Sequence, residues 1–448
     1  MSIDFRNIAR KLKSSLKWLY PGMRVKRWLL LTPLGVFFVL VGVTLLWNVA
    51  VVDYLNSLAH FVAVQSDGTI DLSKIKVYLP ISITSIILGL VLMFVSIRQV
   101  VNSIASVISP SHKDHLADVI YQRRYLAQGY RIVVIGGGTG LSTMLRGLKE
   151  YTSNIVAVVT VTDDGGSSGL LNRQLGMLPP GDIRNCLVAL ADEETLMTEL
   201  FQHRFDDAEE GLKGHSFGNL LIAAMTNITG EFEQAIKETS KVLAIRGNVF
   251  PSTTQTVKLC AQMDDDEIIE GECNIVTDRR QIKRITLSPS DVQPLDEVLE
   301  AIRLADAIII GPGSVYTSII PNLLVDKMSD TICKSDAIKI YVCNVMTQPG
   351  ETDHYRASDH VKAVISHSGK RIFDYVLLNK EFPSSDLLNR YCDLGSELVS
   401  PDSETIKEMG YKPVLGDYIS QTDVVRHDPG KLAQAILKLV YEKAFNPK

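Results

Sequence analysis

The sequence predicts an α/β protein with a Rossmann-like open parallel sheet and a helical insertion, preceded by a two-helix transmembrane hairpin. Three observations support this prediction. Two long stretches without a charged residue lie near the N-terminus, short apolar runs alternate with helical patterns after residue 131, and glycine-rich turns follow several of these runs. Alternating strands and helices are typical of parallel sheets, and a glycine-rich turn between a strand and a helix is suited to binding phosphate.

The N-terminal third of the chain contains two apolar stretches, residues 28–52 and 77–97, and neither has a charged residue. A helix needs roughly 20 apolar residues to span a bilayer. Both stretches are therefore predicted to be transmembrane helices, with a buried core helix or a cleaved signal sequence as the alternative.

The distribution of basic residues predicts the topology of this hairpin. Residues 1–27 contain eight Lys or Arg and one acid, whereas residues 53–76 contain only two lysines. The positive-inside rule then predicts a basic cytoplasmic tail over 1–27 and an extracytoplasmic loop over 53–76. We expect a multi-pass protein of the cell membrane whose N-terminus and C-terminal domain are both cytoplasmic.

The remaining composition excludes some classes of function. Residues 28–448 contain 38 basic and 50 acidic residues, a formal charge of −12, and a general nucleic-acid-binding protein would instead show a basic face. The six cysteines are scattered without a CxxC pair, so we expect reduced, mostly buried thiols and no zinc site. They are Cys186, Cys260, Cys273, Cys333, Cys343 and Cys392.

Residues 98–130 are expected to be a linker with a helix over 115–129, and residues 131–448 to form one α/β domain. Nearly continuous apolar runs predict buried parallel strands; they lie at 131–135, 154–161, 305–311, 337–344 and 374–379. The first two strands flank a helix expected over about 141–151, which makes a β-α-β unit. Residues 182–245 are expected to be mainly helical, and a small antiparallel region is expected around 250–290.

The first strand is followed by the sequence IGGGTGLS, residues 135–142, with glycines at 136, 137, 138 and 140. Glycine allows a tight turn and lets backbone N–H groups approach a phosphate at the start of the next helix. The full dinucleotide fingerprint is absent, because Leu141 stands where its third glycine would fall. The turn therefore predicts a phosphate site, and a merely tight turn is the alternative.

The second strand is followed by VTVTDDGGSSG, in which Asp163 and Asp164 are adjacent. Dinucleotide-binding sheets place an acid at this point, against a ribose hydroxyl. Three roles remain open for the pair: contact with the ribose or base, coordination of Mg²⁺ beside phosphates, and capping of a local turn.

Four later loops are further candidates. In LPPGDIRN, Asp182 is expected to be a helix N-cap, with Arg184 in the first turn.

In GHSFGN, the side chains of His215, Ser216 and Asn219 are suited to anionic groups, but the absence of a G-x-S-x-G elbow disfavours a serine hydrolase. GPGSVYTS, residues 311–318, is a second glycine-containing turn between a predicted strand and a helix, and it is a candidate phosphate site for the same reason as the first. NVMTQPGETDHY, residues 344–355, groups polar side chains that would line a pocket or form a solvated loop: Thr347, Gln348, Glu351, Thr352, Asp353 and His354.

These motifs together resemble one family. IGGGTGLSTMLRGLK, TVTDDGGSSG, LPPGDIRN, GHSFGNLL, GPGSVYTSIIPNLL and NVMTQPGET follow one another as they do in the YvcK-like gluconeogenesis factors of the CofD-like superfamily. The resemblance covers about residues 131–440. A common YvcK-like protein begins near its first strand, so the hairpin departs from that pattern.

The resemblance implies a Rossmann-like domain that binds nucleotide sugars, notably UDP-N-acetylglucosamine (UDP-GlcNAc), and a role in cell shape and envelope synthesis during gluconeogenic growth. The related CofD transfers 2-phospholactate from a guanylyl-activated donor to a deazaflavin and uses Mg²⁺. Taken together with the hydropathy and charge patterns, the expected partners are a nucleotide sugar, the membrane, envelope-synthesis proteins and a second copy of the chain, without nucleic acid.

The resemblance also implies ligand-binding residues. Gly137, Gly138, Thr139 and Gly140 would meet the pyrophosphate, and Asp163 and Asp164 would lie near the nucleoside or the transferred group. Asn219 and Ser314 would add polar contacts, Arg426 of the VVRHD motif would pair with a diphosphate, and Tyr391 would stack on a base or sugar; a surface ion pair and a packed aromatic are the alternatives for these last two.

Two functions therefore remain open from the sequence. The first is a membrane-tethered nucleotide-sugar sensor without turnover. The second is a CofD-like transferase in which Asp163 or Asp164 acts at the reacting group and an aspartate, with Asp164 as the candidate, holds Mg²⁺.

Overall fold

The computed structural model describes residues 26–62, 72–108, 124–192, 194–205, 212–421 and 424–445. The chain divides into two compact units, residues 1–121 and 122–448, which are described separately below. Most of the predicted basic tail and most of the predicted linker helix lie outside the described residues. Residues 124–127, at the end of the expected linker helix, are helical.

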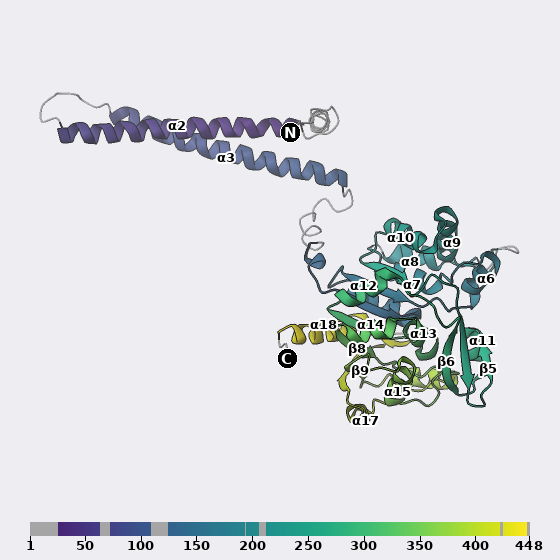
Figure 1. The fold of residues 1–448 in the computed structure, drawn as a ribbon. Helices are drawn as coiled ribbons and strands as arrows, with labels where there is room; N and C mark the ends of the chain where they lie inside the picture. The colour runs from purple at the N-terminus through teal and green to yellow at the C-terminus, as the bar shows by residue number, and fades with distance from the viewer. Residues whose placement is uncertain are drawn as a thin grey trace, which may run out of the picture. The chain divides into compact units, whose positions relative to one another are not determined.

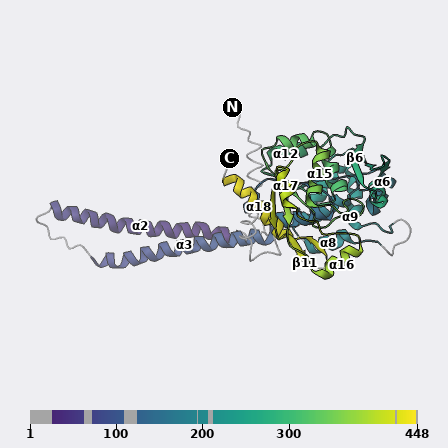
Figure 2. The ribbon, with the colours of Figure 1, turned by 90° about the horizontal axis from the view of Figure 1, so that it is seen from below.

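The first unit is a hairpin of two long helices, α2 (Lys26–Val62) and α3 (Leu72–Ile108), which lie side by side in opposite directions (Figures 1 and 2). Each contains a stretch long and apolar enough to cross a membrane, Leu30–Trp47 and Leu79–Ser103, and only 11% and 17% of the residues of these stretches are buried. Both helices extend beyond the predicted spans, so the segment between them is shorter than the predicted loop.

Small residues allow the two helices of the hairpin to approach closely. A Cβ atom on Gly89 would lie 2.6 Å from the carbonyl oxygen of Gly35, and a Cβ atom on Gly42 would lie 2.7 Å from that of Ser82. The hydroxyl groups of Thr32 and Ser96 are hydrogen-bonded across the interface at 2.7 Å. Small residues and hydroxyl hydrogen bonds are the usual means by which helices associate in a bilayer.

The second unit is built on a seven-stranded sheet in the order β10-β9-β8-β7-β1-β2-β3, in which every pair is parallel. The strands are β1 (Ile132–Gly136), β2 (Ile155–Val159), β3 (Asn248–Pro251), β7 (Ala307–Ile310), β8 (Ile338–Val342), β9 (Tyr375–Asn379) and β10 (Lys412–Gly416). The five predicted strands are therefore confirmed, each shortened at one or both ends or shifted by one residue. Their apolar runs are buried because helices cover both faces of the sheet.

The chain passes outward from β1 through β2 to β3, and then returns to the other side of β1 to form β7 to β10. The strand order thus reverses between β1 and β7. In open α/β sheets, ligands bind beyond the carboxyl ends of the strands at this reversal. The loops after β1 and β7 are the two glycine-rich turns that the sequence singled out.

Alternate residues of β1 face opposite layers. Ile132 and Val134 pack with helices α5, α7, α9 and α18, whereas Val133 and Ile135 pack with α12 to α15 and with the small antiparallel sheet. The helices of the first layer and its surroundings are α5 (Gly138–Leu148), α6 (Gly166–Leu175), α7 (Gly181–Leu190), α8 (Glu194–Gln202), α9 (Phe217–Thr229), α10 (Phe232–Val242) and α18 (Pro429–Phe445). Those of the second are α11 (Glu272–Asp278), α12 (Asp296–Leu304), η3 (Val315–Ile319), α13 (Ile320–Leu324), α14 (Met328–Lys334), α15 (Ala357–Ser368) and α17 (Ser403–Glu408); α16 (Ser385–Asp393) lies beyond β9.

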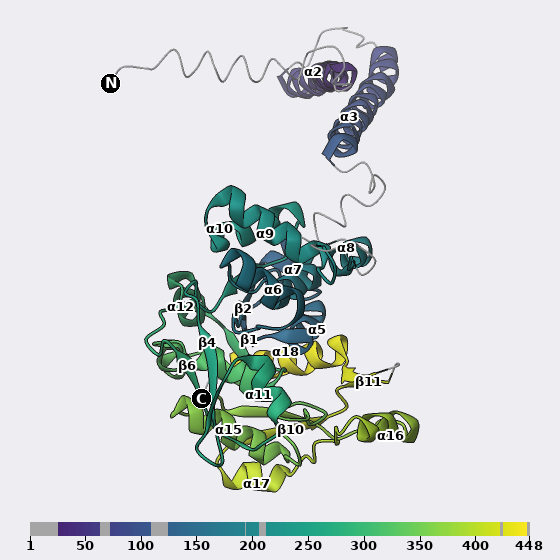
Figure 3. The ribbon, with the colours of Figure 1, turned by 90° about the vertical axis from the view of Figure 1, so that its right-hand side faces the viewer.

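The predicted helical insertion is confirmed as α7 to α10, and α8, α9 and α10 gather at the end of the domain beyond β2 (Figure 3). The predicted antiparallel region is also confirmed. It consists of β4 (Lys258–Met263), β5 (Ile268–Glu270) and β6 (Ile282–Ser288), in the order β5-β4-β6. A two-stranded antiparallel pair, β11 (Ile419–Gln421) and β12 (Val425–His427), precedes α18.

One expectation about the cysteines was wrong. All six are free thiols, but only Cys186, Cys260 and Cys343 are buried, whereas Cys273, Cys333 and Cys392 are exposed. The buried three lie on α7, on β4 and directly after β8, where the apolar pattern of a core element applies; the exposed three lie on the outer sides of short helices.

Candidate functional site

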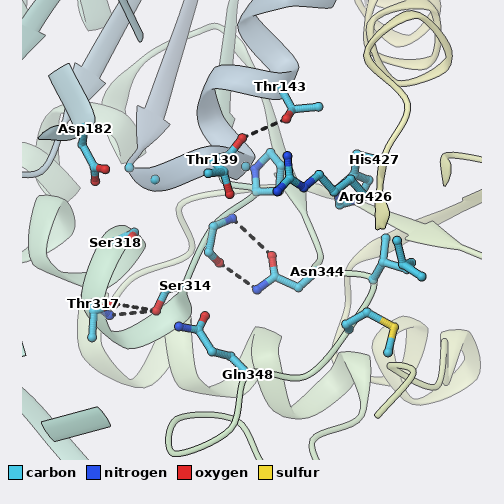
Figure 4. Close-up of a pocket in the computed structure, with 18 of the residues that line it drawn as sticks. Thr139, Thr143, Asp182, Ser314, Thr317, Ser318, Asn344, Gln348, Arg426 and His427 are labelled. Atoms are coloured by element: carbon cyan, nitrogen blue, oxygen red, sulfur yellow. Dashed lines mark hydrogen bonds between the residues drawn. The ribbon is translucent and has the colours of Figure 1, made fainter. Parts of the chain in front are cut away.

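A cavity of about 420 Å³ opens beyond the carboxyl ends of β1, β2, β7 and β8, at the reversal of strand order. Its walls come from seven separate segments of the chain, and Figure 4 shows how several of their side chains lie around it. The residues that line it are Gly137, Gly138, Thr139, Gly140, Thr143, Asp163, Asp182, Glu272, Pro312, Gly313, Ser314, Thr317, Ser318, Asn344, Val345, Met346, Gln348, Val425, Arg426 and His427.

The glycine turn after β1 leads directly into α5, whose first residue is Gly138. The first backbone N–H groups of a helix have no partner within it, so this turn offers donors at the cavity. Gly138 has a φ of +66°, a conformation that favours glycine. A Cβ atom on Gly140 would lie 2.7 Å from the carbonyl oxygen of Pro312, so the two glycine-rich turns are in backbone contact.

The turn after β7 is held by a buried carboxylate. Glu351, which is 5% exposed, accepts hydrogen bonds from the hydroxyl of Ser314, from the hydroxyl of Thr317 at 3.2 Å and from the backbone N–H of Tyr316 at 3.3 Å. Burial raises the pKa of this carboxyl above its ordinary value. From the next strand, Asn344 accepts from the N–H of Gly313 and donates to its carbonyl oxygen. Both contacts fix the backbone of the PGS segment.

The adjacent aspartates after β2 point to different surroundings. Asp163 lines the cavity, and its Oδ1 also accepts from the N–H of Gly165 at 3.0 Å. Asp164 is not among the lining residues; its Oδ1 accepts from the backbone N–H of Cys273 at 3.0 Å, at the start of α11. Capping of a local turn, one of the three roles left open from the sequence, is confirmed for Asp163, which also faces the cavity. Asp164 instead caps the start of α11, far along the chain.

Asp182 is a cavity residue as well, and the expectation that it is an N-cap was wrong. Helix α7 begins at Gly181 with Pro180 as its N-cap, so Asp182 lies in the first turn. A Cβ atom on Gly137 would lie 2.6 Å from Oδ2 of Asp182, which shows how closely this carboxyl packs against the glycine turn. Its removal from water raises the pKa of Asp182 to about 6, with Asp163 adding to the rise and a hydrogen bond from the backbone of Gly138 opposing it.

A third carboxyl, that of Glu272, reaches the cavity from the antiparallel region. Removal from water raises the pKa of Glu272 to about 9, and the carboxyls of Asp163, Asp182 and Glu351 add to the rise. The wall beside Asp182 is therefore acidic. Among the described residues, no three His, Cys, Asp or Glu side chains are close enough to form a metal site by themselves. Mg²⁺, however, is commonly held by one or two carboxylates and the phosphates of a ligand, and Asp163 with Asp182 fits that pattern.

Arg426, from β12, lines the cavity in the region away from Asp182 (Figure 4). Tyr391 is not among the lining residues. It is partly buried against the apolar cluster that contains Val345 and Val425, and its hydroxyl accepts from the backbone N–H of Val425 at 3.1 Å. Tyr391 therefore supports the strand that presents Arg426.

Asn219 is likewise not among the lining residues. It belongs to a buried polar network beneath the loop after β2. Its amide accepts from Arg184 at 3.1 Å and donates to Ser167 at 3.0 Å, and Ser167 is 3.2 Å from Nδ1 of His215. Ser216 is the N-cap of α9 and accepts a hydrogen bond from the guanidinium of Arg184. These residues support the loop that presents Asp163.

The structure thus brings seven of the ten predicted ligand-binding residues together around one cavity. They are Gly137, Gly138, Thr139, Gly140, Asp163, Ser314 and Arg426. The site also contains Glu272, which lies in none of the motifs, and Asn344, the first residue of the NVMTQPGETDHY loop, which was not among the predicted ligand-binding residues. Of the polar loop after β8, Gln348 lines the cavity. Thr347 accepts a hydrogen bond from the backbone N–H of Glu397 in a neighbouring loop, whereas Thr352 and Asp353 accept from backbone N–H groups within their own loop.

Comparison with known proteins supports the reading of the motifs. The family model described as "2-phospho-L-lactate transferase CofD" matches residues 132–419. The "Gluconeogenesis factor" of Bacillus subtilis is 48% identical over 318 residues, covering 71% of this chain and 100% of that protein. The chain belongs to the gluconeogenesis factor family. A crystal structure of a UPF0052 family member from Bacillus halodurans is 48% identical and superposes with a TM-score of 0.67, covering 69% of this chain and 99% of that one.

The similarity to some members of the gluconeogenesis factor family extends over the sequence of the hairpin. The relative named "Putative gluconeogenesis factor" from Nostoc sp. is 47% identical over 428 residues, covering 94% of this chain and 92% of that protein. An alignment of that extent includes the hairpin as well as the α/β domain. The expectation that the hairpin departs from the family is therefore correct for short members, such as that of Bacillus subtilis, and wrong for long ones.

The pKa of Asp182 predicts how stability depends on pH in the absence of divalent cations. The folded pKa of about 6 lies above the ordinary value of 3.8, so the folded state binds a proton that the unfolded state has released. This contribution is complete below about pH 4 and is lost as the pH rises through about 6. Relative to Asp182→Asn, the wild type should lose stability by up to about 1.4 kcal/mol per pH unit in that window. Urea unfolding in EDTA at several pH values measures the difference, and parallel pH profiles would refute it.

Proposed function

We propose that the chain binds a nucleotide sugar of the UDP-GlcNAc type in this cavity, and that it senses the supply of this precursor for envelope synthesis and cell shape. The single observation that supports this most is the backbone contact between the two glycine-rich turns at the reversal of strand order, where Gly140 meets Pro312. Two turns without obstructing side chains offer N–H donors from both sides to a diphosphate.

The rest of the cavity suits the other parts of such a ligand. Arg426 offers a guanidinium, which pairs well with phosphate oxygens. Asn344 and Gln348 offer amide groups, and Val345 and Met346 offer apolar surface, on the side of β8. The volume of about 420 Å³ lies within the range of small-molecule sites.

Titration of UDP-GlcNAc into the full chain in detergent tests the proposal. We expect saturable heat of binding at one site per chain and no release of product. Absence of heat with UDP-GlcNAc, together with binding of a guanine nucleotide, would refute the assignment of the ligand.

We also propose that the hairpin spans the cell membrane, with the α/β domain in the cytoplasm. The exposed apolar surfaces of α2 and α3 and the eight basic residues before residue 28 support it. In intact cells, a membrane-impermeant maleimide should label a Gly68→Cys variant and leave the wild type, with its exposed Cys273, Cys333 and Cys392, unlabelled. Labelling of the wild type would reverse the topology.

The acidic wall favours a second candidate, a CofD-like transfer of a phosphorylated group from a nucleotide donor. Asp163 and Asp182 would hold Mg²⁺, which would neutralise phosphate charge during transfer. Glycine N–H groups and Arg426 would orient the donor. This candidate predicts Mg²⁺-dependent product formation that is lost in Asp163→Asn while the donor still binds. A chain that binds the donor but forms no product with any acceptor extract would exclude it.

A further inference from the structure

Glu272 is the one cavity residue that comes from the antiparallel region, the small sheet of β4, β5 and β6 with α11. It is the first residue of α11 and follows Gly271, whose φ is +94°. Its carboxyl is hydrogen-bonded to Thr317, one of the residues of the turn after β7. A segment inserted between β3 and β7 therefore contributes one side chain to the cavity.

The position of Glu272 depends on Asp164. One carboxylate oxygen of Asp164 accepts from the N–H of Cys273, the residue after Glu272, at 3.0 Å. The other oxygen lies where a Cβ atom of Gly271 would be 2.5 Å away, so Asp164 also packs against the residue before Glu272. Asp164 thus contacts the backbone on both sides of Glu272.

The far end of α11 is fixed independently. A Cβ atom on Gly350 would lie 2.2 Å from the carbonyl oxygen of Val276, so the loop after β8 packs directly against the backbone of α11. With Asp164 at one end and Gly350 at the other, α11 is held against the rim of the cavity, and Glu272 has a defined direction.

The chemistry of this wall restricts what Glu272 can contact. The titratable groups that face it are the carboxyls of Asp163, Asp182 and Glu351, while Arg426 lines a different region of the cavity. Oxygen atoms of carboxyls and of phosphates are both hydrogen-bond acceptors. With its raised pKa of about 9, the carboxyl of Glu272 is protonated at neutral pH, so it donates through its O–H and accepts through its carbonyl oxygen. The hydroxyl and amide groups of a sugar, which both donate and accept, match it better than phosphates placed beside the other carboxyls.

We propose that Glu272 contacts a hydroxyl or amide group of the sugar part of the nucleotide sugar, and that Asp164 is a positioning residue that holds Glu272 there. This inference rests on the proposed function. It gives the two adjacent aspartates separate roles, since Asp163 faces the ligand and Asp164 acts through α11.

The test compares UDP-GlcNAc with UDP by titration into the full chain. Glu272→Ala should lower the affinity for UDP-GlcNAc about five- to tenfold, the loss expected for one hydrogen bond, and should change the affinity for UDP by less than about twofold. Asp164→Ala should show the same selective loss, whereas Asp164→Asn, which keeps an acceptor oxygen for the N–H of Cys273, should bind as the wild type does. Glu270→Ala, an exposed carboxylate two residues away that pairs with Lys258, is the matched control and should change neither ligand. Thermal unfolding verifies that each variant is folded.

Each other outcome is decisive. Equal loss of UDP and UDP-GlcNAc in Glu272→Ala would place Glu272 outside the sugar subsite and overturn the inference alone. Asp164→Asn as weak as Asp164→Ala would mean that the charge of Asp164, and not its hydrogen bond to α11, is what matters. If the wild type binds UDP-GlcNAc no more tightly than UDP, the proposed sugar contact is wrong. If it binds neither ligand, the proposed function is wrong as well.

Discussion

Replacing Gly140 with alanine is expected to weaken nucleotide-sugar binding by about ten- to a hundredfold. The added Cβ atom would lie 2.7 Å from the carbonyl oxygen of Pro312 and 3.2 Å from the backbone nitrogen of Gly313. Neither atom belongs to a flexible side chain, so the turn after β1 and the turn after β7 must move apart. Forcing an extra carbon into such a contact typically costs 1–3 kcal/mol, and each 1.4 kcal/mol is a tenfold change in affinity.

Titration of UDP-GlcNAc measures the loss, and Gly430→Ala provides a matched control. Gly430 lies in the first turn of α18, and the atom nearest to an added Cβ would be Oδ1 of Asp428 at 3.4 Å, an ordinary contact. That variant should bind as the wild type does. Unchanged affinity in Gly140→Ala would show that the contact between the two turns has no part in forming the site.

Much of the site could be predicted because its residues follow strands. A parallel sheet places the carboxyl ends of its strands at one edge, so motifs far apart in the sequence, such as the glycine turn at 137–140 and Ser314, could be expected to meet. The buried strands could also be predicted, because strands covered by helices on both faces are nearly continuous apolar runs in the sequence.

The direction of individual side chains could not be predicted in the same way. Asp163 and Asp164 are neighbours, yet one lines the cavity and the other binds the N–H of Cys273, 109 positions further along the chain. The sequence pattern of Asp182 is that of a cap, and only the close approach of Gly137 shows that its carboxyl lies at the glycine turn after β1. Glu272 has no motif at all, because its position results from the packing of a separate small sheet against the main one.

The sequence also could not distinguish residues that hold other side chains in place from residues that contact the ligand. Asn219 and Tyr391 were expected to touch the ligand, and in the structure they hold the loop of Asp163 and the strand of Arg426. A motif shows that a residue type is required at a position. It does not show whether that side chain contacts the ligand or hydrogen-bonds to a residue that does. For this reason their substitution should change affinity through the residues that they hold.

Replacing Glu351 with alanine is expected to destabilise the domain by about 3 kcal/mol or more, the largest loss that we expect from a single carboxylate. Glu351 is 5% exposed and accepts hydrogen bonds from Ser314, Thr317 and the backbone of Tyr316. Its removal leaves the buried N–H of Tyr316 and one of the two hydroxyl groups without an acceptor, because Ser314 and Thr317 are also hydrogen-bonded to each other. Each such donor costs about 1–3 kcal/mol. Urea unfolding of the full chain in detergent measures the change in the α/β domain.

Two further variants separate the hydrogen bonds of Glu351 from its charge. Glu351→Gln keeps an acceptor oxygen and lacks the charge that burial disfavours, so it should retain most of the stability. Glu397→Ala, which removes an exposed carboxylate paired with His354, should change the free energy of unfolding by less than about 0.5 kcal/mol. If Glu351→Gln were as unstable as Glu351→Ala, the carboxylate would be required as a charge. The turn after β7 would then be an anionic structure that relies on bound cations, and the mode of phosphate binding proposed for it would have to be abandoned.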